Sequence, residues 1–218
     1  MLKNVISKIV ATTAITVLAS AALPVAATVV TTNQTASINN YSFGDTTVGN
    51  HFHVNVGDGV AVNYFDNERG KGFAEFDLAG VTAGKAVLSF KVSSFSDIYT
   101  NLPHAYFFPV SIFAYVGDNL IEFSDYLTPT LGTVGSFATV GLEIGDSLSF
   151  DVTDFLAEVL GTGATSLGFL FQSANLVGPQ SAIRFGDVTL TVPEPSSVAL
   201  LALGLAGVAV SRKRKPKA

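Results

Sequence analysis

Hydrophobic and polar residues alternate along much of the chain between residues 28 and 192, with the period of two that is typical of β-strands. The alternation is clear in His51–Val56 and Val60–Tyr64. Further apolar runs indicate strands at Gly72–Phe76, Ala86–Val92, Val110–Val116, Ser147–Val152, Ser166–Gln172 and Ala182–Val192. Clusters of Gly, Pro, Asn and Asp separate these runs, as expected of turns. About eight strands favour an all-β fold, an antiparallel two-sheet sandwich of the jelly-roll type.

One segment has the spacing of a helix instead. Apolar residues recur there three or four positions apart, at Val152, Phe155, Leu156, Val159 and Leu160. Asp151, Thr153 or Asp154 is in place to cap the start of this helix, and Gly161 to end it. The sandwich is therefore expected to carry one short helix.

The first two predicted strands are close together in the sequence. Only Gly57, Asp58 and Gly59 separate them. Pairing Val56 with Val60 sets the apolar residues of both strands on one side and leaves a three-residue loop, in which Gly59 supplies the left-handed position. The sequence predicts that these two strands form a hairpin.

The N-terminal residues 1–27 have the layout of a helical secretory signal peptide. Lys3 and Lys8 precede the run Ile9–Leu23, which is poor in charge, and the small residues Val25–Ala27 follow. Cleavage is predicted after Ala27, although Ala19–Ala21 offers an earlier site. The alternative is a retained membrane anchor, but Thr and Ser interrupt the run and it is short for a span of about 20 residues.

The C-terminal residues 193–218 have three parts in a fixed order. Pro193, Glu194 and Pro195 come first, on backbone that the two prolines bias toward extended conformations. An apolar helical segment follows, carried by Val198, Leu200, Leu201, Leu203, Leu205, Val208 and Val210. The last part is a basic cluster formed by Arg212, Lys213, Arg214, Lys215 and Lys217. Residues 198–210 as a helix reach only about 20 Å against a hydrocarbon core of about 30 Å, so the tail holds a membrane weakly.

This combination of Pro-Glu-Pro, a short apolar helix and a terminal basic cluster resembles the PEP-CTERM sorting signal of bacteria. The resemblance covers Pro193–Ala218 and implies that an exosortase of the inner membrane recognises Pro193, Glu194 and Pro195. It also implies signal peptidase as the other processing enzyme. The protein would be held in the inner membrane transiently and then delivered to the cell envelope, the cell surface or the extracellular matrix of a biofilm. The alternative, an ordinary tail anchor, has no need of the Pro-Glu-Pro motif.

The domain between the two ends, residues 28–192, is strongly acidic. It holds five basic and sixteen acidic residues, a net charge of −11. Such a charge disfavours binding to nucleic acid or to anionic lipid and suits solubility or cation binding. The chain has no Cys, so an exported domain of this size has to be held together by its hydrophobic core alone.

Three segments of this domain, two of them made of two parts each, resemble the jelly-roll modules of the DNRLRE family in order and spacing. They are Gly72–Leu78, Ala79–Leu88, Phe150–Leu156, Leu167–Phe171 and Ile183–Asp187. The resemblance implies the jelly-roll fold, and some modules of that family bind acidic polysaccharide. Those modules often have an Arg shortly before their Phe-Asp pair, where this chain has Ala74 and Glu75, so polysaccharide binding does not carry over directly.

Catalytic motifs are missing from the sequence. Gly-x-Ser-x-Gly, His-Glu-x-x-His and a phosphate-binding Gly loop do not occur, and His51, His53 and His104 are the only histidines. Asp151 and Asp154 are a candidate pair of acids, but their place before the helix explains them as caps. We therefore predict no enzyme activity and no catalytic residues, and a secreted glycan hydrolase is a distant third hypothesis.

Two candidate ligand sites come from residue type. Calcium prefers several oxygen ligands, which Asp66, Asn67, Glu68 and Asp187 offer, against the alternative of ordinary turn residues. A sugar-binding loop is the hypothesis for residues 96–109, where Tyr99, Asn101, His104 and Tyr106 are clustered; partly buried strand ends are the alternative. The main hypothesis is a non-catalytic structural or adhesive domain. The alternative is a calcium-dependent polysaccharide-binding module with exopolysaccharide as its partner.

Overall fold

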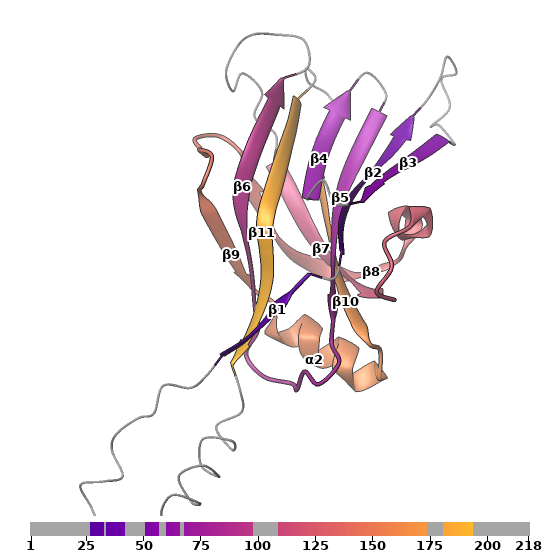
Figure 1. Cartoon of the computed structure of the whole chain (residues 1–218), viewed down its shortest axis with the longest axis vertical. Coiled ribbons are helices and arrows are strands. Elements are labelled where there is room, and N and C mark those ends of the chain that lie inside the picture. Colours follow the sequence, from indigo (N-terminus) through magenta and orange to yellow (C-terminus); the bar gives the residue numbers. More distant parts are fainter. Residues whose placement is uncertain are drawn as a thin grey trace, which may run out of the picture. The chain divides into compact units, whose positions relative to one another are not determined.

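The computed structural model describes residues 27–32, 34–41, 51–56, 60–65, 68–97, 109–173 and 181–193, and strands dominate this part of the chain. The strands are β1 (Ala27–Thr31), β2 (Gln34–Tyr41), β3 (His51–Val56), β4 (Val60–Phe65), β5 (Glu68–Asp77), β6 (Val87–Asp97), β7 (Pro109–Gly117), β8 (Thr130–Ala138), β9 (Ser147–Asp151), β10 (Ser166–Ser173) and β11 (Ser181–Pro193). A 3-10 helix, η1 (Phe123–Leu127), lies between β7 and β8, and an α-helix, α2 (Thr153–Thr162), lies between β9 and β10 (Figure 1).

The strands form two antiparallel sheets. One sheet has the order β3-β2-β5-β10-β7-β8. In the other, β9 pairs with β6 and β6 with β11, whose second edge is shared by β4 and β1. The predicted mostly-β fold with two antiparallel sheets and one short helix is confirmed, while its jelly-roll type stays a prediction.

The strand β5 joins the two sheets. Residues 69–75 of β5 pair with β2 on one edge. On its other edge, residues 68–70 pair with β4 and residues 72–77 pair with β10. The edge of β5 is therefore divided between the two sheets, which separate at this point and enclose the main core.

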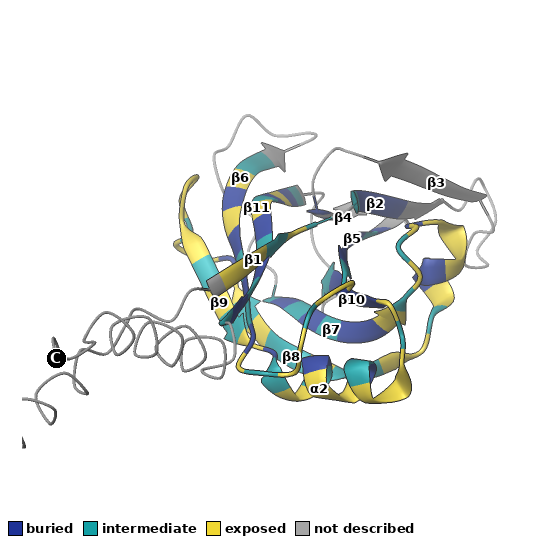
Figure 2. Ribbon diagram, turned by 60° about the horizontal axis from the view of Figure 1, so that its bottom comes forward, coloured by how far each residue is buried: buried dark blue, intermediate teal, exposed yellow. Residues whose placement is uncertain are grey.

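Aromatic side chains fill the space between the sheets. The ring of Phe90 on β6 lies 5.0 Å from that of Phe185 on β11 and 5.1 Å from that of Phe171 on β10, measured between centroids. Helix α2 packs Leu156 and Val159 against the same core and closes one end of it (Figure 2). The preponderance of Phe among the aromatic residues thus has a direct use, because these rings bridge the two layers.

A second, smaller core lies on the opposite face of the β5-β10-β7 sheet. It is formed by Ala36, Ile38, Phe73, Tyr115, Ile121, Tyr126 and Leu170. Ile121 and Tyr126 belong to the connection from β7 to β8, residues 118–129, which we call the β7–β8 loop. Because both faces of β10 are covered, its residues 166–171 are buried without alternation.

The predicted helix is present, but its predicted end is wrong by two residues. The carboxylate of Asp151 accepts hydrogen bonds from the N–H and hydroxyl of Thr153, at 3.0 and 2.6 Å, at the start of α2. These bonds lower the pKa of Asp151. The helix continues past Gly161 and stops at Gly163, whose φ of 77° is the left-handed conformation that favours glycine.

The predicted hairpin between β3 and β4 is also wrong. Both strands exist, but Val56 pairs with Ala36 of β2, and Val60 pairs with Phe185 of β11. The tighter hairpin forms one connection later, where Phe65 pairs with Glu68 and only two residues separate β4 from β5. Strands that are distant in the sequence offer apolar faces that match those of β3 and β4 equally well. Closeness in the sequence therefore did not decide which strands pair.

Residues 27–193 form one unit, and the two chain ends lie outside the described residues. The predicted signal helix, the apolar segment 198–210 and the basic cluster 212–217 all fall in those ends. In the part of the chain that the structure describes, neither helix has the length and apolar character needed to cross a bilayer.

Candidate functional site

Three residues in register across neighbouring strands build the polar centre of the smaller core. Gly168 of β10 pairs with Tyr115 of β7 on one side and with Glu75 of β5 on the other. A Cβ on Gly168 would lie 2.2 Å from the Tyr115 ring, so the ring occupies the space above the glycine. The Tyr115 hydroxyl thereby reaches Glu75 and donates to its Oε1 at 2.9 Å.

Glu75 is a fully buried carboxylate whose two oxygens are both bonded. Its Oε2 accepts from the backbone N–H of Asn119 at 2.7 Å and from the hydroxyl of Ser166 at 3.1 Å. Gly117 leaves room for this group, because a Cβ there would lie 2.6 Å from the Glu75 carboxyl carbon. Burial and the neighbouring Glu75 carboxylate raise the pKa of Tyr115 above its usual range, so the hydroxyl is a donor at physiological pH.

The β7–β8 loop is fastened to the sheet at three places. Beside the bond from Asn119 to Glu75, the N–H of Ile121 donates to Oε1 of Gln34 on β2 at 2.9 Å. Lys71 of β5 donates to the carbonyl oxygen of Tyr126 at 2.9 Å, and its Nζ lies 4.0 Å from the centre of the Tyr126 ring. Asn119 itself has a φ of 73°, a left-handed conformation that asparagine tolerates.

A second buried carboxylate, Asp125, lies in the same loop. Its Oδ2 accepts the N–H of Glu122 at 2.8 Å, which stabilises the first turn of η1. Burial raises the pKa of Asp125 to about 6, and the charges of Glu75, Asp118 and Glu122 act in the same direction. The hydrogen bond from Glu122 opposes the shift and is outweighed by burial.

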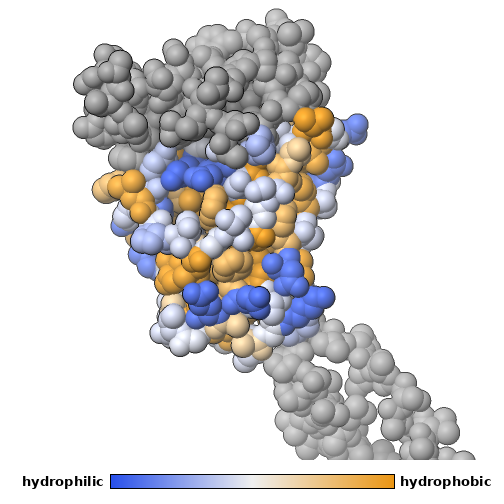
Figure 3. Space-filling view, turned by 180° about the vertical axis from the view of Figure 1, so that it is seen from behind, coloured by the Kyte–Doolittle hydropathy of each residue, from blue (hydrophilic) through white to orange (hydrophobic). Residues whose placement is uncertain are grey.

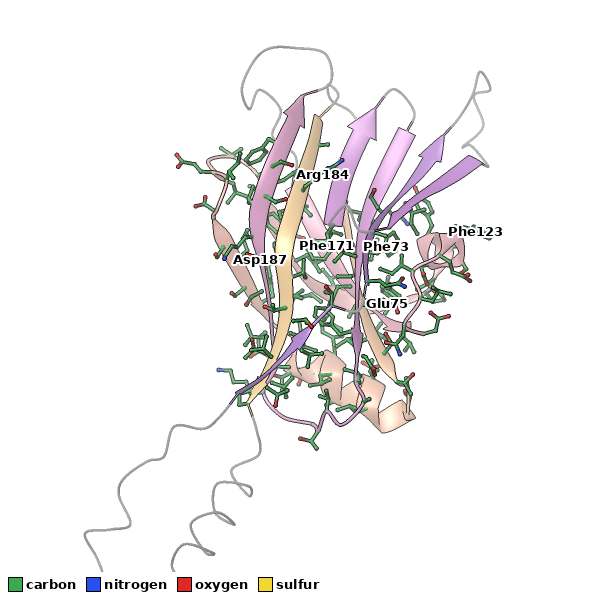
Figure 4. All side chains as sticks on the ribbon, viewed as in Figure 1. Phe73, Glu75, Phe123, Phe171, Arg184 and Asp187 are labelled. Carbon is green, nitrogen blue, oxygen red and sulfur yellow. The ribbon has the colours of Figure 1, made fainter. Side chains whose placement is uncertain are left out.

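The outer side of the β7–β8 loop carries large apolar side chains. Leu120, Phe123 and Leu127 are 51%, 55% and 71% exposed, and we call these three residues the loop patch. Figure 4 shows Glu75 beneath the loop on the sheet and Phe123 on the outer side of η1. The buried polar bonds and the exposed apolar residues are therefore two sides of one element.

Comparison with protein families identifies the end of the chain. The family described as the PEP-CTERM protein-sorting motif matches residues 191–215. The chain carries a PEP-CTERM sorting motif. It is accordingly an exported protein that an exosortase sorts, and it passes the membrane to reach the cell envelope or surface. A search of curated proteins finds no match to the chain.

The PEP-CTERM motif overlaps the folded domain. Its first three matched residues, Thr191–Pro193, are the last residues of β11. Pro193 pairs with Ala27, the first residue of β1. Sequence reasoning placed the boundary of the tail at Pro193 but gave no indication that the N-terminal strand lies against it.

The candidate calcium ligands are not brought together in the described part of the chain. Asp66 and Asn67 lie outside the described residues, as does the side chain of Glu68 on β5. Asp187 is exposed on β11, and its Oδ2 accepts from Nζ of Lys91 at 3.0 Å. Within the described ranges no cluster of three His or acidic side chains has metal-binding geometry. The calcium site stays a prediction.

The candidate sugar-binding residues Tyr99, Asn101, His104 and Tyr106 all lie outside the described residues, so this site too stays a prediction. Other exposed apolar residues, Val140 and Ile144, lie on the connection from β8 to β9. Figure 3 shows hydrophobic and hydrophilic residues intermingled over the visible face of the domain.

Sequence reasoning missed the buried hydrogen bond between Tyr115 and Glu75. Two glycines were the available signal: Gly117 follows one apolar run and Gly168 lies inside another. A glycine in such a strand often marks the close approach of another group. The identity of that group was not deducible, because Tyr115 and Glu75 are 40 residues apart.

Proposed function

We propose that residues 27–193 are a non-catalytic structural or adhesive domain of a surface or extracellular-matrix protein. The observation that carries this proposal is the β7–β8 loop, which is bonded to Glu75, Gln34 and Lys71 on one side and presents the loop patch on the other. A loop held in this way loses little conformational entropy when its apolar side chains contact another surface.

The polar centre of the smaller core supports a non-catalytic role. Both oxygens of Glu75 accept hydrogen bonds from within the fold, and its side chain is closed to solvent. A general acid or base has to reach the proton it transfers, either directly or through one water. Glu75 is instead suited to holding the loop, as is Tyr115.

The sorting motif supports a location outside the inner membrane. An exosortase-sorted protein is delivered outside the inner membrane, where a disulfide-free β-sandwich with a net charge of −11 between residues 28 and 192 stays soluble until it contacts its partner. We propose the extracellular polymer matrix of a biofilm as the destination, with exopolysaccharide among its contacts. The short apolar segment and basic cluster of the tail provide the transient hold in the inner membrane.

The adhesive role can be tested by replacing the loop patch. The double variant Phe123→Ser, Leu127→Ser should bind the isolated extracellular matrix of the producing strain about tenfold less tightly than the wild type, because it removes most of the exposed apolar area of the loop. Ile144→Ser is the matched control, since Ile144 is 66% exposed on a different connection. Equal binding by the double variant and the wild type, at equal melting temperature, would contradict the proposal.

The alternative is the calcium-dependent polysaccharide-binding module implied by the DNRLRE resemblance. Its support is the two-sheet antiparallel architecture, together with the residue types at Tyr99, Asn101, His104 and Tyr106. Binding of the mature protein to a glycan array, measured with and without a chelator, separates the two. Chelator-sensitive binding to an acidic glycan favours the module, and the absence of binding favours the structural role.

A further inference from the structure

The outer side of the β7–β8 loop combines large apolar side chains with acidic ones. The three residues of the loop patch are between 51% and 71% exposed. Asp118 and Glu122, which lie next to the patch residues along the chain, are exposed as well. Residues 118–129 contain three acids and neither Lys nor Arg. The surface of the loop is therefore apolar and negatively charged at once, a combination that restricts which partners can bind it.

Both exposed carboxylates are held in place by hydrogen bonds within the loop. Oδ1 of Asp118 accepts from the backbone N–H of Leu120 at 3.0 Å, and Oε1 of Glu122 accepts from the hydroxyl of Ser124 at 2.8 Å. Each carboxylate can accept several hydrogen bonds, so these contacts orient the groups and leave them able to accept from a partner. The two acids thus have defined positions beside the loop patch.

The charges around the loop act on one another. Burial, and then the charges of Glu75, Asp118 and Glu122, raise the pKa of Asp125 to about 6. This repulsion between carboxylates shows that the loop has a negative potential, which a cation placed beside it would lower. Lys71 offsets part of the charge from the sheet side, where it is bonded to the loop, but the acids outnumber it.

The loop keeps this surface in one conformation. The N–H groups of Asn119 and Ile121, on either side of Leu120, donate to Glu75 and Gln34 of the sheet. The backbone that carries Leu120 is therefore fixed before any partner arrives, and little conformational entropy is lost on binding. Figure 4 shows the neighbouring η1 with Phe123 on its outer side.

The combination of charge and apolar area selects the chemistry of the partner. An acidic glycan or an anionic lipid surface would be repelled by the carboxylates of Asp118 and Glu122. A purely apolar surface would remove these carboxylates from water without giving them a hydrogen-bond donor, which is costly. A helix with apolar side chains on one face and Lys or Arg along its borders satisfies both requirements, because it covers a compact apolar patch and pairs with the acids that flank it.

We propose that the β7–β8 loop binds a cationic amphipathic helix of another protein, whose apolar face covers the loop patch and whose Lys or Arg side chains pair with Asp118 and Glu122. The inference rests on the proposed adhesive function of the loop and gives the chemical class of its partner. Asp118 and Glu122 are then specificity-determining residues, and the loop patch supplies the apolar contact area.

The test uses the protein purified from its producing strain and a synthetic helical peptide of about 18 residues, with Leu on one face and Lys along both borders. Two matched peptides carry Glu in place of Lys, or Ser in place of Leu. Fluorescence anisotropy measures their binding. The Leu/Lys peptide should bind at least about tenfold more tightly than either matched peptide, and its affinity should fall as the salt concentration rises, because exposed ion pairs are screened.

Two double variants locate the charge effect. Asp118→Asn with Glu122→Gln removes both charges and keeps both hydrogen-bond acceptors, so the loop should fold as in the wild type. This variant should bind the Leu/Lys peptide about fivefold less tightly. Asp154→Asn with Glu158→Gln is the matched control, since both acids are exposed on α2, and its affinity should equal that of the wild type. If the loop variant melts at a lower temperature, Glu122→Gln replaces it, with an expected loss of about threefold.

Equal affinity for the Lys and Glu peptides, or equal effects of the two double variants, would overturn the inference. Binding of phosphatidylglycerol vesicles through the loop patch would also overturn it, because the partner would then be a lipid surface. If no peptide binds while Phe123→Ser, Leu127→Ser still weakens adhesion to the matrix, the inference fails and the adhesive function stands. If the peptide binds while that variant adheres as the wild type does, the adhesive function fails and the partner class is supported.

Discussion

The side chain of Tyr115 lies over Gly168, the residue that pairs with both Tyr115 and Glu75, and its hydroxyl donates to Oε1 of Glu75 at 2.9 Å. A buried carboxylate is costly unless hydrogen bonds replace its hydration. Here a tyrosine, a serine and a backbone N–H of the β7–β8 loop replace it. The same carboxylate thereby fixes the loop that carries the proposed adhesive surface.

Removing the hydroxyl of Tyr115 tests the importance of this bond. Tyr115→Phe should lower the free energy of unfolding by about 1.5–3 kcal/mol, the range for a hydrogen bond to a charged buried group. Urea unfolding measures the effect. Ser111→Ala in the same strand, which removes an exposed bond to Ser136, should stay within about 0.5 kcal/mol of the wild type. Equal effects of the two substitutions would contradict a special role for Glu75.

Adding a methyl group at Gly168 tests the space above it. Gly168→Ala should lower the free energy of unfolding by about 1–3 kcal/mol or more, because the Cβ would collide with the buried Tyr115 ring. Gly161→Ala is the control, since nothing lies within 4 Å of a Cβ there and Gly161 is inside α2. That substitution should stabilise the domain by about 0.5–1 kcal/mol. A neutral result for Gly168→Ala in thermal melting would show that the ring can move aside.

Asp125 should make stability depend on pH in an unusual direction. Its pKa is raised from 3.8 to about 6 in the folded state, so the folded protein binds this proton more tightly than the unfolded chain. The stabilising contribution is therefore complete below the unfolded value and is lost as the pH rises through about 6. Asp125→Asn cannot titrate and lacks this dependence. Urea unfolding between pH 4 and pH 7 should show the wild type losing stability relative to the variant, and parallel pH profiles would contradict the prediction.

Local pattern was sufficient for most of the strands that line the main core. β5, β6, β7, β9, β10 and β11 all lie where apolar residues mark them in the sequence. β1, β2 and β8 were not predicted. In β8, Gly132 and Gly135 interrupt the pattern, and these glycines make room for the rings of Phe155 and Phe150. The same rings come from segments that follow β8, so the reason for the glycines is visible only in the folded state.

Strand pairing was predicted wrongly where a local partner competed with a distant one. The pairing of Val60 with Phe185 in β11 joins strands that are far apart in the sequence. Period-two patterns assign a face to each residue but leave the partner strand open, because every core strand offers a matching apolar face.

The sequence by itself determined the sorting motif at residues 191–215, since such a motif is recognised in one continuous stretch of chain. It also determined that a helix follows β9, because the spacing of the apolar residues of α2 is local, although the helix ends at Gly163 and not at Gly161. Only the tertiary structure decided that Glu75 is buried beneath the β7–β8 loop and that Ala27 lies beside Pro193. Those relationships join residues far apart along the chain, and they are stabilised by hydrogen bonds and strand pairing that exist only after the sheets have formed.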